Sequence, residues 1–262
     1  MSWARRRAFA ALYLLGRGLE SAATALRYAA AGLLDRATLQ AAIIEEWRQF
    51  GIAQEASDDV SLFAWEDARF IDRDDRVLLI GCGTGRDLLA LLDRGYRPDG
   101  LDLVPEAVER ARQRLTERTL EALVRVGDIE TVELGQRYDV FVFSWFCYAY
   151  IPESARRVRV LEKLSAHLAR RGRILLSYAP AQQAGPRRTL RLTRAVARLM
   201  GASWRPEAGD SLAIAGPTMS SVTFQHFFQP GEVEAEARAA GLHVLAHEPS
   251  DQAITMALGK PG

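Results

Sequence analysis

Short apolar runs alternate along most of the chain with stripes of helical spacing. The runs lie at residues 77–80, 123–126, 138–143, 174–178, 242–245 and 253–258. Runs of this length with few polar residues are typical of strands buried on both faces of a sheet. Between them, leucine and alanine recur every three or four residues, which is typical of amphipathic helices. The alternation therefore predicts an α/β domain with a mostly parallel sheet.

The first 46 residues are rich in Ala, Leu and Arg and predict one or two helices. Their apolar stripe consists of Leu12, Leu15, Leu19, Ala22, Leu26, Ala29 and Leu33. Residues 1–40 contain six arginines and two acids, which gives a charge of +4, whereas the remainder carries −3. A basic amphipathic helix of this kind can lie on a membrane surface, or it can pack against its own domain or a second copy of the chain. The sequence leaves these alternatives open.

The regular alternation stops between residues 180 and 229, a stretch with four prolines and a basic helical pattern around residues 190–200. It resumes with a short helical pattern after Gly231 and two closing apolar runs. We therefore expect an N-terminal helical arm or lid over residues 1–60 and one main domain over residues 61–262. The main domain is expected to carry an insertion at about residues 180–229.

A glycine-rich turn at residues 81–85 joins the first apolar run to a leucine-rich helical pattern that begins at Arg86. Glycines at this place let a ligand approach the backbone closely. They also adopt positive φ values without strain. Asp102 ends the next apolar run, where a carboxylate can accept hydrogen bonds from ribose hydroxyls. A dinucleotide-binding turn would need glycine in place of Arg86, and a phosphate-binding P-loop would need Gly-Lys-Ser/Thr. What remains is a G-x-G-x-G nucleotide turn or an ordinary strand-to-helix turn.

This G-x-G-x-G turn after Val77–Ile80 resembles motif I of the class I S-adenosylmethionine (SAM)-dependent methyltransferases. The resemblance extends over roughly residues 76–178, where it includes an LxxLxxxLxxGGxhhhS-like stretch with Arg171 in place of the first glycine. It implies a three-layer Rossmann-like sandwich with a mostly parallel seven-stranded sheet in the order 3-2-1-4-5-7-6, whose last strand is antiparallel. It also implies SAM as the cofactor.

The resemblance further implies which residues hold the cofactor. Asp128 stands where the family has the acid that binds the adenine amino group, and Ile129 stands where an apolar residue packs on the ring. The expected set is Gly81, Cys82, Gly83, Gly85, Arg86, Asp102, Leu103, Asp128, Ile129 and Ser144. Leu79 departs from the pattern, because the family commonly has an acid there that ties down the glycine turn. Asp87 or a residue of the lid could replace that acid.

An aromatic cluster follows the fourth apolar run, at the edge of the sheet where ligands bind in open α/β folds. The residues expected to bind the acceptor are Trp145, Tyr148, Tyr150 and Trp204, and those expected to form a lid are Trp47, Phe63 and Trp65. Each of these rings could instead belong to the core. A hydroxyl or amine acceptor would profit from a base, which is most often histidine. His226 is the best placed of the four histidines, and Tyr148 is the alternative; no metal site is expected.

Composition limits the function further. A net charge of +1 leaves no excess of positive charge to neutralise phosphates, which argues against a nucleic-acid partner. Cys82 and Cys147 suggest no disulfide framework and fit a reducing cytoplasm. Arg17 and Glu20 interrupt the apolar stretch that follows Arg5, Arg6 and Arg7, too early for an export signal. No segment is long enough to span a membrane.

We therefore expect a cytoplasmic methyltransferase that acts on O or N of a small specialised or cell-envelope metabolite. The partners expected beside this acceptor are a membrane surface, reached through the N-terminal helix, or a second copy of the chain. Two other functions remain open. The chain could use SAM in a cyclase or lyase reaction, or it could be a non-catalytic SAM-binding module whose N-terminal helix docks on a membrane or a partner.

Overall fold

The structure is a computed structural model that describes residues 3–53, 69–181, 187–215, 221–249 and 254–261. It divides into two compact units. Unit 1 comprises residues 1–39 and 183–208, and unit 2 comprises residues 40–182 and 209–262. Unit 1 holds α1 (Trp3–Ala31) and α6 (Arg187–Leu199), and the helix α2 (Arg36–Ala53) enters unit 2 at residue 40.

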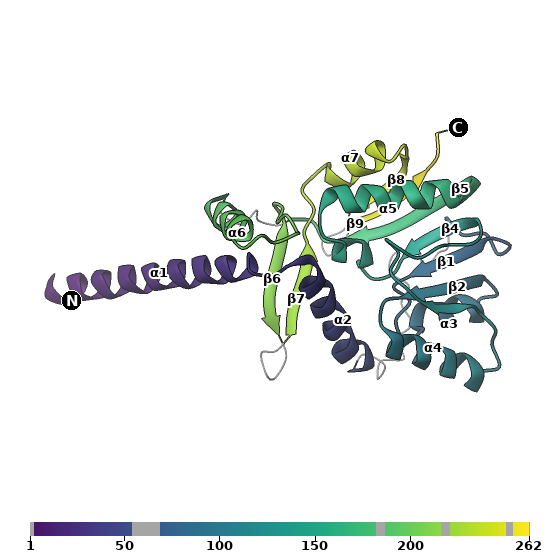
Figure 1. Cartoon of the computed structure of the whole chain (residues 1–262), viewed down its shortest axis with the longest axis horizontal. Coiled ribbons are helices and arrows are strands. Elements are labelled where there is room, and N and C mark those ends of the chain that lie inside the picture. Colours follow the sequence, from purple (N-terminus) through teal and green to yellow (C-terminus); the bar gives the residue numbers. More distant parts are fainter. Residues whose placement is uncertain (1–2, 54–68, 182–186, 216–220, 250–253, 262) are drawn as a thin grey trace. The chain divides into compact units, whose positions relative to one another are not determined.

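Unit 2 contains the strands and the remaining helices (Figure 1). In chain order they are β1 (Arg76–Ile80), α3 (Arg86–Asp93), β2 (Arg97–Asp102), α4 (Pro105–Glu117), β3 (Val124–Val126), β4 (Tyr138–Phe143), the 3₁₀ helix η2 (Cys147–Tyr150), α5 (Ser154–His167), β5 (Leu168–Tyr178), β6 (Asp210–Ala215), β7 (Ser221–His226), α7 (Glu232–Ala239), β8 (His243–Pro249) and β9 (Ile254–Gly259).

Seven strands of unit 2 form one sheet in the order β3-β2-β1-β4-β5-β9-β8. The first five pair in parallel, whereas β9 runs antiparallel to both β5 and β8. Counted along the chain within this sheet, the order is 3-2-1-4-5-7-6 with an antiparallel last strand, so the predicted topology is confirmed. Strands β6 and β7 pair separately as an antiparallel hairpin within the expected insertion.

Helices cover both faces of the sheet. Successive residues of a strand point to opposite sides, so these apolar strands present two faces that must be buried. Leu78 and Ile80 share a core with residues of α5 and α7, whereas Val77 and Leu79 share a second core with residues of α3 and α4. Leu79 is completely buried in this second core. An unpaired carboxylate at this position would be buried at high cost, so the apolar residue fits its surroundings.

The end of α5 does not lie at the glycine that follows it. Arg170, Arg171 and Gly172 have the composition of a helix end, but α5 ends at His167 and β5 begins at Leu168. The pairing of β4 with β5 is irregular here, since Tyr138 pairs with Leu168 and Val140 pairs with Arg173. A Cβ on Gly172 would lie 2.7 Å from the Asp139 carbonyl oxygen, so this glycine permits a close strand approach and does not end a helix.

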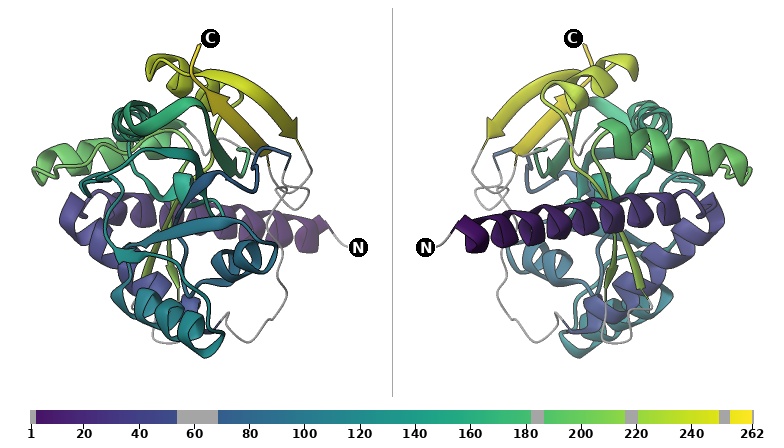
Figure 2. Two further views of the ribbon diagram at one scale, coloured as in Figure 1. Left: turned by 90° about the vertical axis from the view of Figure 1, so that its right-hand side faces the viewer. Right: turned by 90° about the vertical axis from the view of Figure 1, so that its left-hand side faces the viewer.

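Unit 1 consists mainly of α1 packed against α6, and Figure 2 shows α1 as one uninterrupted helix. The chain lies close to α6 at Gly32, where a Cβ would lie 2.6 Å from the Thr193 carbonyl oxygen. Most of the predicted apolar stripe is exposed, with values from 57% at Leu33 to 71% at Leu26. No helix among the described residues combines the length and the apolar character that crossing a membrane requires.

Candidate functional site

The glycine turn after β1 leaves open space at its middle glycine. Gly81, Gly83 and Gly85 have φ values of +77°, +54° and +91°, which favour glycine over any other residue. A Cβ on Gly81 would lie 2.1 Å from Cys147 Sγ, and one on Gly85 would lie 3.2 Å from Ala111 Cβ. At Gly83 it would have no neighbouring atom within 4 Å. The turn is therefore packed at both ends and free at its centre, where a ligand could lie against the backbone.

Asp102 joins the end of β2 to this turn. Its Oδ2 accepts a hydrogen bond of 2.7 Å from the Gly83 N–H, and its Oδ1 accepts one of 2.9 Å from the Val104 N–H. Burial raises the pKa of Asp102, although the N–H groups of Val104, Gly83 and Leu103 act in the opposite direction. The carboxylate lies beside the open centre of the turn, where the sequence places an acid for ribose hydroxyls.

Asp128 follows β3 and contacts a residue that the sequence did not single out. Its Oδ1 accepts a hydrogen bond from the Glu130 N–H at 2.8 Å, and its Oδ2 accepts one from Gln40 Nε2 at 2.9 Å. Ile129 beside it is buried. Gln40 belongs to α2, 88 residues earlier in the chain, and no motif in the sequence links the two residues.

Asp87 forms a second acidic group at the start of α3. Its Oδ2 accepts a hydrogen bond from Ser144 Oγ at 2.6 Å, and its Oδ1 accepts one from Arg86 Nε at 3.1 Å. The Arg86 guanidinium lies 5.5 Å from the ring centre of Trp145, within the range of a cation–π contact. Arg86 and Ser144 were expected at the cofactor, and the structure joins them through Asp87. One indication of the role of Asp87 was present in the sequence, because the acid that the family commonly has is missing at Leu79.

The side chain of Cys82, the cysteine within the glycine turn, is directed toward β2 and away from the centre of the turn. Its side chain is buried, and a Cβ on Gly100 of β2 would lie 2.8 Å from its sulfur. Only its backbone is therefore free to face a ligand at the turn. Leu103, next to Asp102, is half-buried.

The segment after β4 has an unusual backbone. Trp145 and Phe146 both have positive φ values, +34° and +56°, although neither is glycine. Such conformations cost energy and are found preferentially at functional sites. Tyr150, at the end of η2, contacts Trp47 of α2 edge to face, with ring centres 5.2 Å apart. The structure thus joins one predicted lid residue to one predicted acceptor residue, whereas Phe63 and Trp65 lie outside the described residues.

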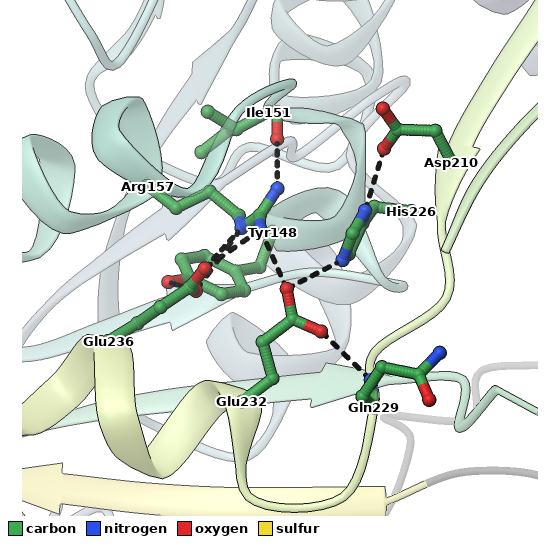
Figure 3. A network of polar contacts seen from close by, with 8 residues as sticks. All are labelled: Tyr148, Ile151, Arg157, Asp210, His226, Gln229, Glu232 and Glu236. Atoms are coloured by element: carbon green, nitrogen blue, oxygen red, sulfur yellow. Dashed lines mark hydrogen bonds and ion pairs between the residues drawn. The ribbon is translucent and has the colours of Figure 1, made fainter. Parts of the chain in front are cut away.

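His226 does not have the geometry of a general base. It is completely buried, with Nδ1 2.7 Å from Asp210 Oδ1 and Nε2 2.9 Å from Glu232 Oε1 (Figure 3). Burial alone would lower the pKa of His226, but the hydrogen bonds to these two carboxylates outweigh it and raise the pKa to about 9. The ring is thus a cation at neutral pH that donates both N–H groups, and neither nitrogen has a lone pair free for a substrate proton.

Tyr148, the alternative catalytic residue, belongs to the same buried network. Its hydroxyl donates a hydrogen bond of 2.6 Å to Glu236 Oε2, and its ring stacks on Phe228. Arg157 binds Glu236 through two nitrogens and also contacts Glu232 and the Ile151 carbonyl oxygen (Figure 3). The geometry gives His226 and Tyr148 structural contacts, while Trp204 is a residue of unit 1.

The contacts of His226 make the stability of unit 2 depend on pH. The pKa is about 9 in the folded chain and about 6.5 in the unfolded chain. The imidazolium therefore contributes roughly 3 kcal/mol that is fully present below pH 6.5 and is lost as the pH rises through 9. The charged groups of unit 2 that act on the ring are Asp210 of β6, Glu232 of α7 and Arg157 of α5. We expect the thermal unfolding midpoint of wild type to fall over this range.

The matched variants separate this contribution from other titrations. His226→Gln should unfold at a lower temperature than wild type near pH 6.5 and should lose most of the decline toward alkaline pH. His243→Gln alters an exposed histidine and should keep the wild-type pH profile. Equal slopes for wild type and His226→Gln would show that the ring is not held as a cation.

Comparisons with known proteins find one matching family model and several similar folds. Residues 77–172 match the family model described as "Methyltransferase domain". The glycopeptide N-methyltransferase MtfA, solved with S-adenosyl-L-homocysteine (SAH), superposes with a TM-score of 0.59 at 20% identity over 78% of this chain and 91% of its own. A SAM-dependent methyltransferase from Methanosarcina mazei gives 0.58 at 19% identity, over 74% and 96%.

The CcbJ methyltransferase from Streptomyces caelestis gives a TM-score of 0.55 at 14% identity, over 75% of this chain and 87% of its own. No curated protein matches the sequence. The structural likenesses support the fold, and the family model covers the segment from β1 into β5 that carries the glycine turn. Residues 77–172 therefore form a methyltransferase domain with the Rossmann-like fold of class I.

Proposed function

We propose that the chain is a cytoplasmic SAM-dependent methyltransferase that acts on O or N of a small molecule. The observation that carries this proposal is the glycine turn, which is open at Gly83 and lined by the Asp102 carboxylate. The methyltransferase-domain match and the MtfA structure with SAH support SAM as the cofactor. The net charge of +1 favours a small acceptor over nucleic acid.

The donor groups at the carboxyl ends of the strands fit such a cofactor. Asp102 would accept hydrogen bonds from the ribose hydroxyls, and Asp128 would accept one from the adenine amino group beside Ile129. Asp87 is buried at the turn next to Ser144, so we assign it the place of the acid that the sequence lacks at Leu79. SAM supplies a methyl group on a sulfonium that is itself the leaving group. The protein then has to orient the acceptor and exclude water.

The cofactor assignment is tested by isothermal titration calorimetry with SAH, and NAD⁺ serves as the control ligand. We expect saturable heat with SAH and none with NAD⁺, because Arg86 stands where a dinucleotide turn needs glycine. A folded protein that gives no heat with SAH would refute the proposal. Mass spectrometry of the products formed from SAM without an acceptor distinguishes methyl transfer from a cyclase or lyase reaction.

We also propose that α1 binds the surface of an anionic membrane. Its exposed large apolar residues include Trp3, Phe9, Leu12, Tyr13, Leu14, Leu15, Leu19 and Leu26. Residues 1–31 contain five arginines and one acid, and Arg5, Arg6 and Arg7 lie two to four residues after the exposed Trp3. Interfacial helices combine apolar and aromatic side chains with arginine in this way, so that buried area and attraction to anionic lipid add. The charge favours a lipid surface over a second copy of the same basic helix.

Flotation with lipid vesicles tests this surface on the full chain. We expect the protein to float with phosphatidylglycerol-containing vesicles and to remain behind with pure phosphatidylcholine. Leu15→Glu should reduce flotation about tenfold, because one buried leucine contributes roughly 1.5–3 kcal/mol. Leu199→Glu, which changes the exposed end of α6 in the same unit, is the control and should still float. A protein that ignores anionic vesicles but sediments as a dimer would support the second copy instead.

A further inference from the structure

The helix α2 contacts the segments that follow β3, β2 and β4, three strands of the parallel part of the sheet. Gln40 binds Asp128 after β3, and Arg48 Nε lies 3.0 Å from Glu106 Oε1 in the first turn of α4, which follows β2. Trp47 contacts Tyr150, which follows β4. Residues 40–48 therefore lie across the carboxyl ends of these strands. In open α/β sheets this is the edge at which ligands bind.

Glu46 is the one carboxylate among residues 40–48 of this helix with an unsatisfied buried oxygen. Its Oε2 has no hydrogen-bond partner among the described residues, and the backbone N–H of Phe224 in β7 is a hydrogen-bond donor to the carboxyl group. Burial raises the pKa of Glu46 to about 7, against the opposing effect of that N–H. An oxygen left in this state is costly to the fold. The cost is recovered when a ligand supplies a donor.

Glu46 is linked to the glycine turn through Tyr150 and Cys147. Burial is the main cause that raises the pKa of the Tyr150 hydroxyl, and the nearby Glu46 carboxylate acts in the same direction. Cys147 packs against Gly81, and its thiol is within electrostatic range of Asp102 and Asp87. The helix η2, which holds both Tyr150 and Cys147, thus connects the surroundings of the Glu46 carboxylate with the turn at which the methyl donor would lie.

The chemistry of this group of residues is suited to an amine. A carboxylate oxygen without a partner can accept a charge-assisted hydrogen bond from an ammonium group. The rings of Trp47 and Tyr150 can stabilise the same cation through their faces. A carboxylate with a pKa near 7 is a strong enough base to receive a proton from an ammonium group. It is too weak to remove one from an alcohol, which is a far weaker acid.

We propose that Glu46, with Tyr150 and Trp47, forms the acceptor subsite and that the acceptor is a small amine. This inference rests on the proposed methyl transfer. The amine enters as its ammonium form and gives one proton to the Glu46 carboxylate, which frees the nitrogen lone pair. The lone pair then forms the new N–C bond while the C–S bond of the sulfonium breaks, and the bonding electrons stay on sulfur. The products are the methylated ammonium, the neutral thioether and one proton on Glu46.

The test offers the enzyme two pools of small molecules with methyl-labelled SAM. One pool contains benzylamine, phenethylamine and their N-methyl derivatives, and the other contains the corresponding alcohols. We expect label to enter the amine pool alone. Glu46→Gln should lower this rate at least hundredfold at neutral pH, as expected for loss of a general base. Wild type should gain rate as the pH rises through 7, and the variant should lack this limb.

Two controls keep the outcomes distinct. Glu45→Gln removes the neighbouring carboxylate, which is partly exposed and paired with Arg48, and should keep wild-type rates. Calorimetry with SAH should give the same affinity for wild type and Glu46→Gln. If SAH does not bind wild type, the proposed function fails. If SAH binds, the amine subsite is overturned by label in the alcohols, by no label in any amine, or by an unchanged rate in Glu46→Gln.

Discussion

Replacement of Arg157 by methionine is expected to lower the free energy of unfolding of unit 2 by about 3–5 kcal/mol. The guanidinium is completely buried. It contacts Glu236, Glu232 and the Ile151 carbonyl oxygen (Figure 3). It also lies 5.1 Å from the ring centre of Phe228. Without this cation, the buried Glu236 carboxylate and the half-buried Glu232 carboxylate have too little positive charge nearby. Such uncompensated charges are among the most destabilising single changes in proteins.

Thermal and denaturant unfolding measure this effect, and Arg159→Met is the matched control. Arg159 lies on the same helix but is exposed, so its loss should change the free energy of unfolding by less than about 0.5 kcal/mol. Because α5, β7 and α7 meet at Arg157, we also expect the variant to expose these elements to proteolysis. If both variants unfold at the temperature of wild type, the network does not stabilise the fold.

Asp102→Ala is expected to weaken SAH binding at least tenfold, which corresponds to about 1.4 kcal/mol. The change removes the expected acceptor of the ribose hydroxyls. It also removes the group that holds the N–H of Gly83 and that of Val104, so the turn loses a support on its open side. Calorimetry with SAH measures both consequences together. Circular dichroism should show that the sheet persists, because Asp102 is the last residue of β2.

The control for this variant is Asp74→Ala, which removes an acid whose side chain is 98% exposed. Its affinity for SAH should equal that of wild type. An unchanged affinity in Asp102→Ala would mean that the acid at the end of β2 does not bind the ribose. Asp128 would then be the next carboxylate to test, with loss of the adenine contact as the expected effect.

The sequence predicted the sheet well because buried parallel strands are short and almost wholly apolar. Val77–Ile80 and Tyr138–Phe143 could be assigned in this way, and their order followed from the resemblance. The start of β5 could not, since Arg170, Arg171 and Gly172 have the composition of a helix end. Only the approach of Gly172 to the Asp139 carbonyl, a contact between distant parts of the chain, explains why they lie in a strand.

The part of the candidate site whose backbone is fixed by a motif could be predicted. The part formed by a helix from a distant stretch of the sequence could not. The glycine turn and Asp102 lie together as the motif implied. Gln40 and Glu46 could not be predicted, because an acid or an amide in a helix has no distinctive sequence pattern. The place of His226 in the sequence suggests a base, but the contacts that define its charge come from Asp210 and Glu232, which lie 16 residues before it and 6 residues after it.

Cys147 packs against Gly81, and Cys82 packs against β2. This burial lowers the reactivity of both thiols toward a methyl donor. Burial raises the pKa of both thiols far above the usual value, and the neighbouring carboxylates act in the same direction. Both sulfurs therefore stay protonated, and a protonated thiol is a poor nucleophile. With an electrophilic methyl donor in the turn, two thiolates at this position would be targets for self-methylation. Burial of the thiols, together with the carboxylates that would hold the cofactor, thus also protects the protein from it.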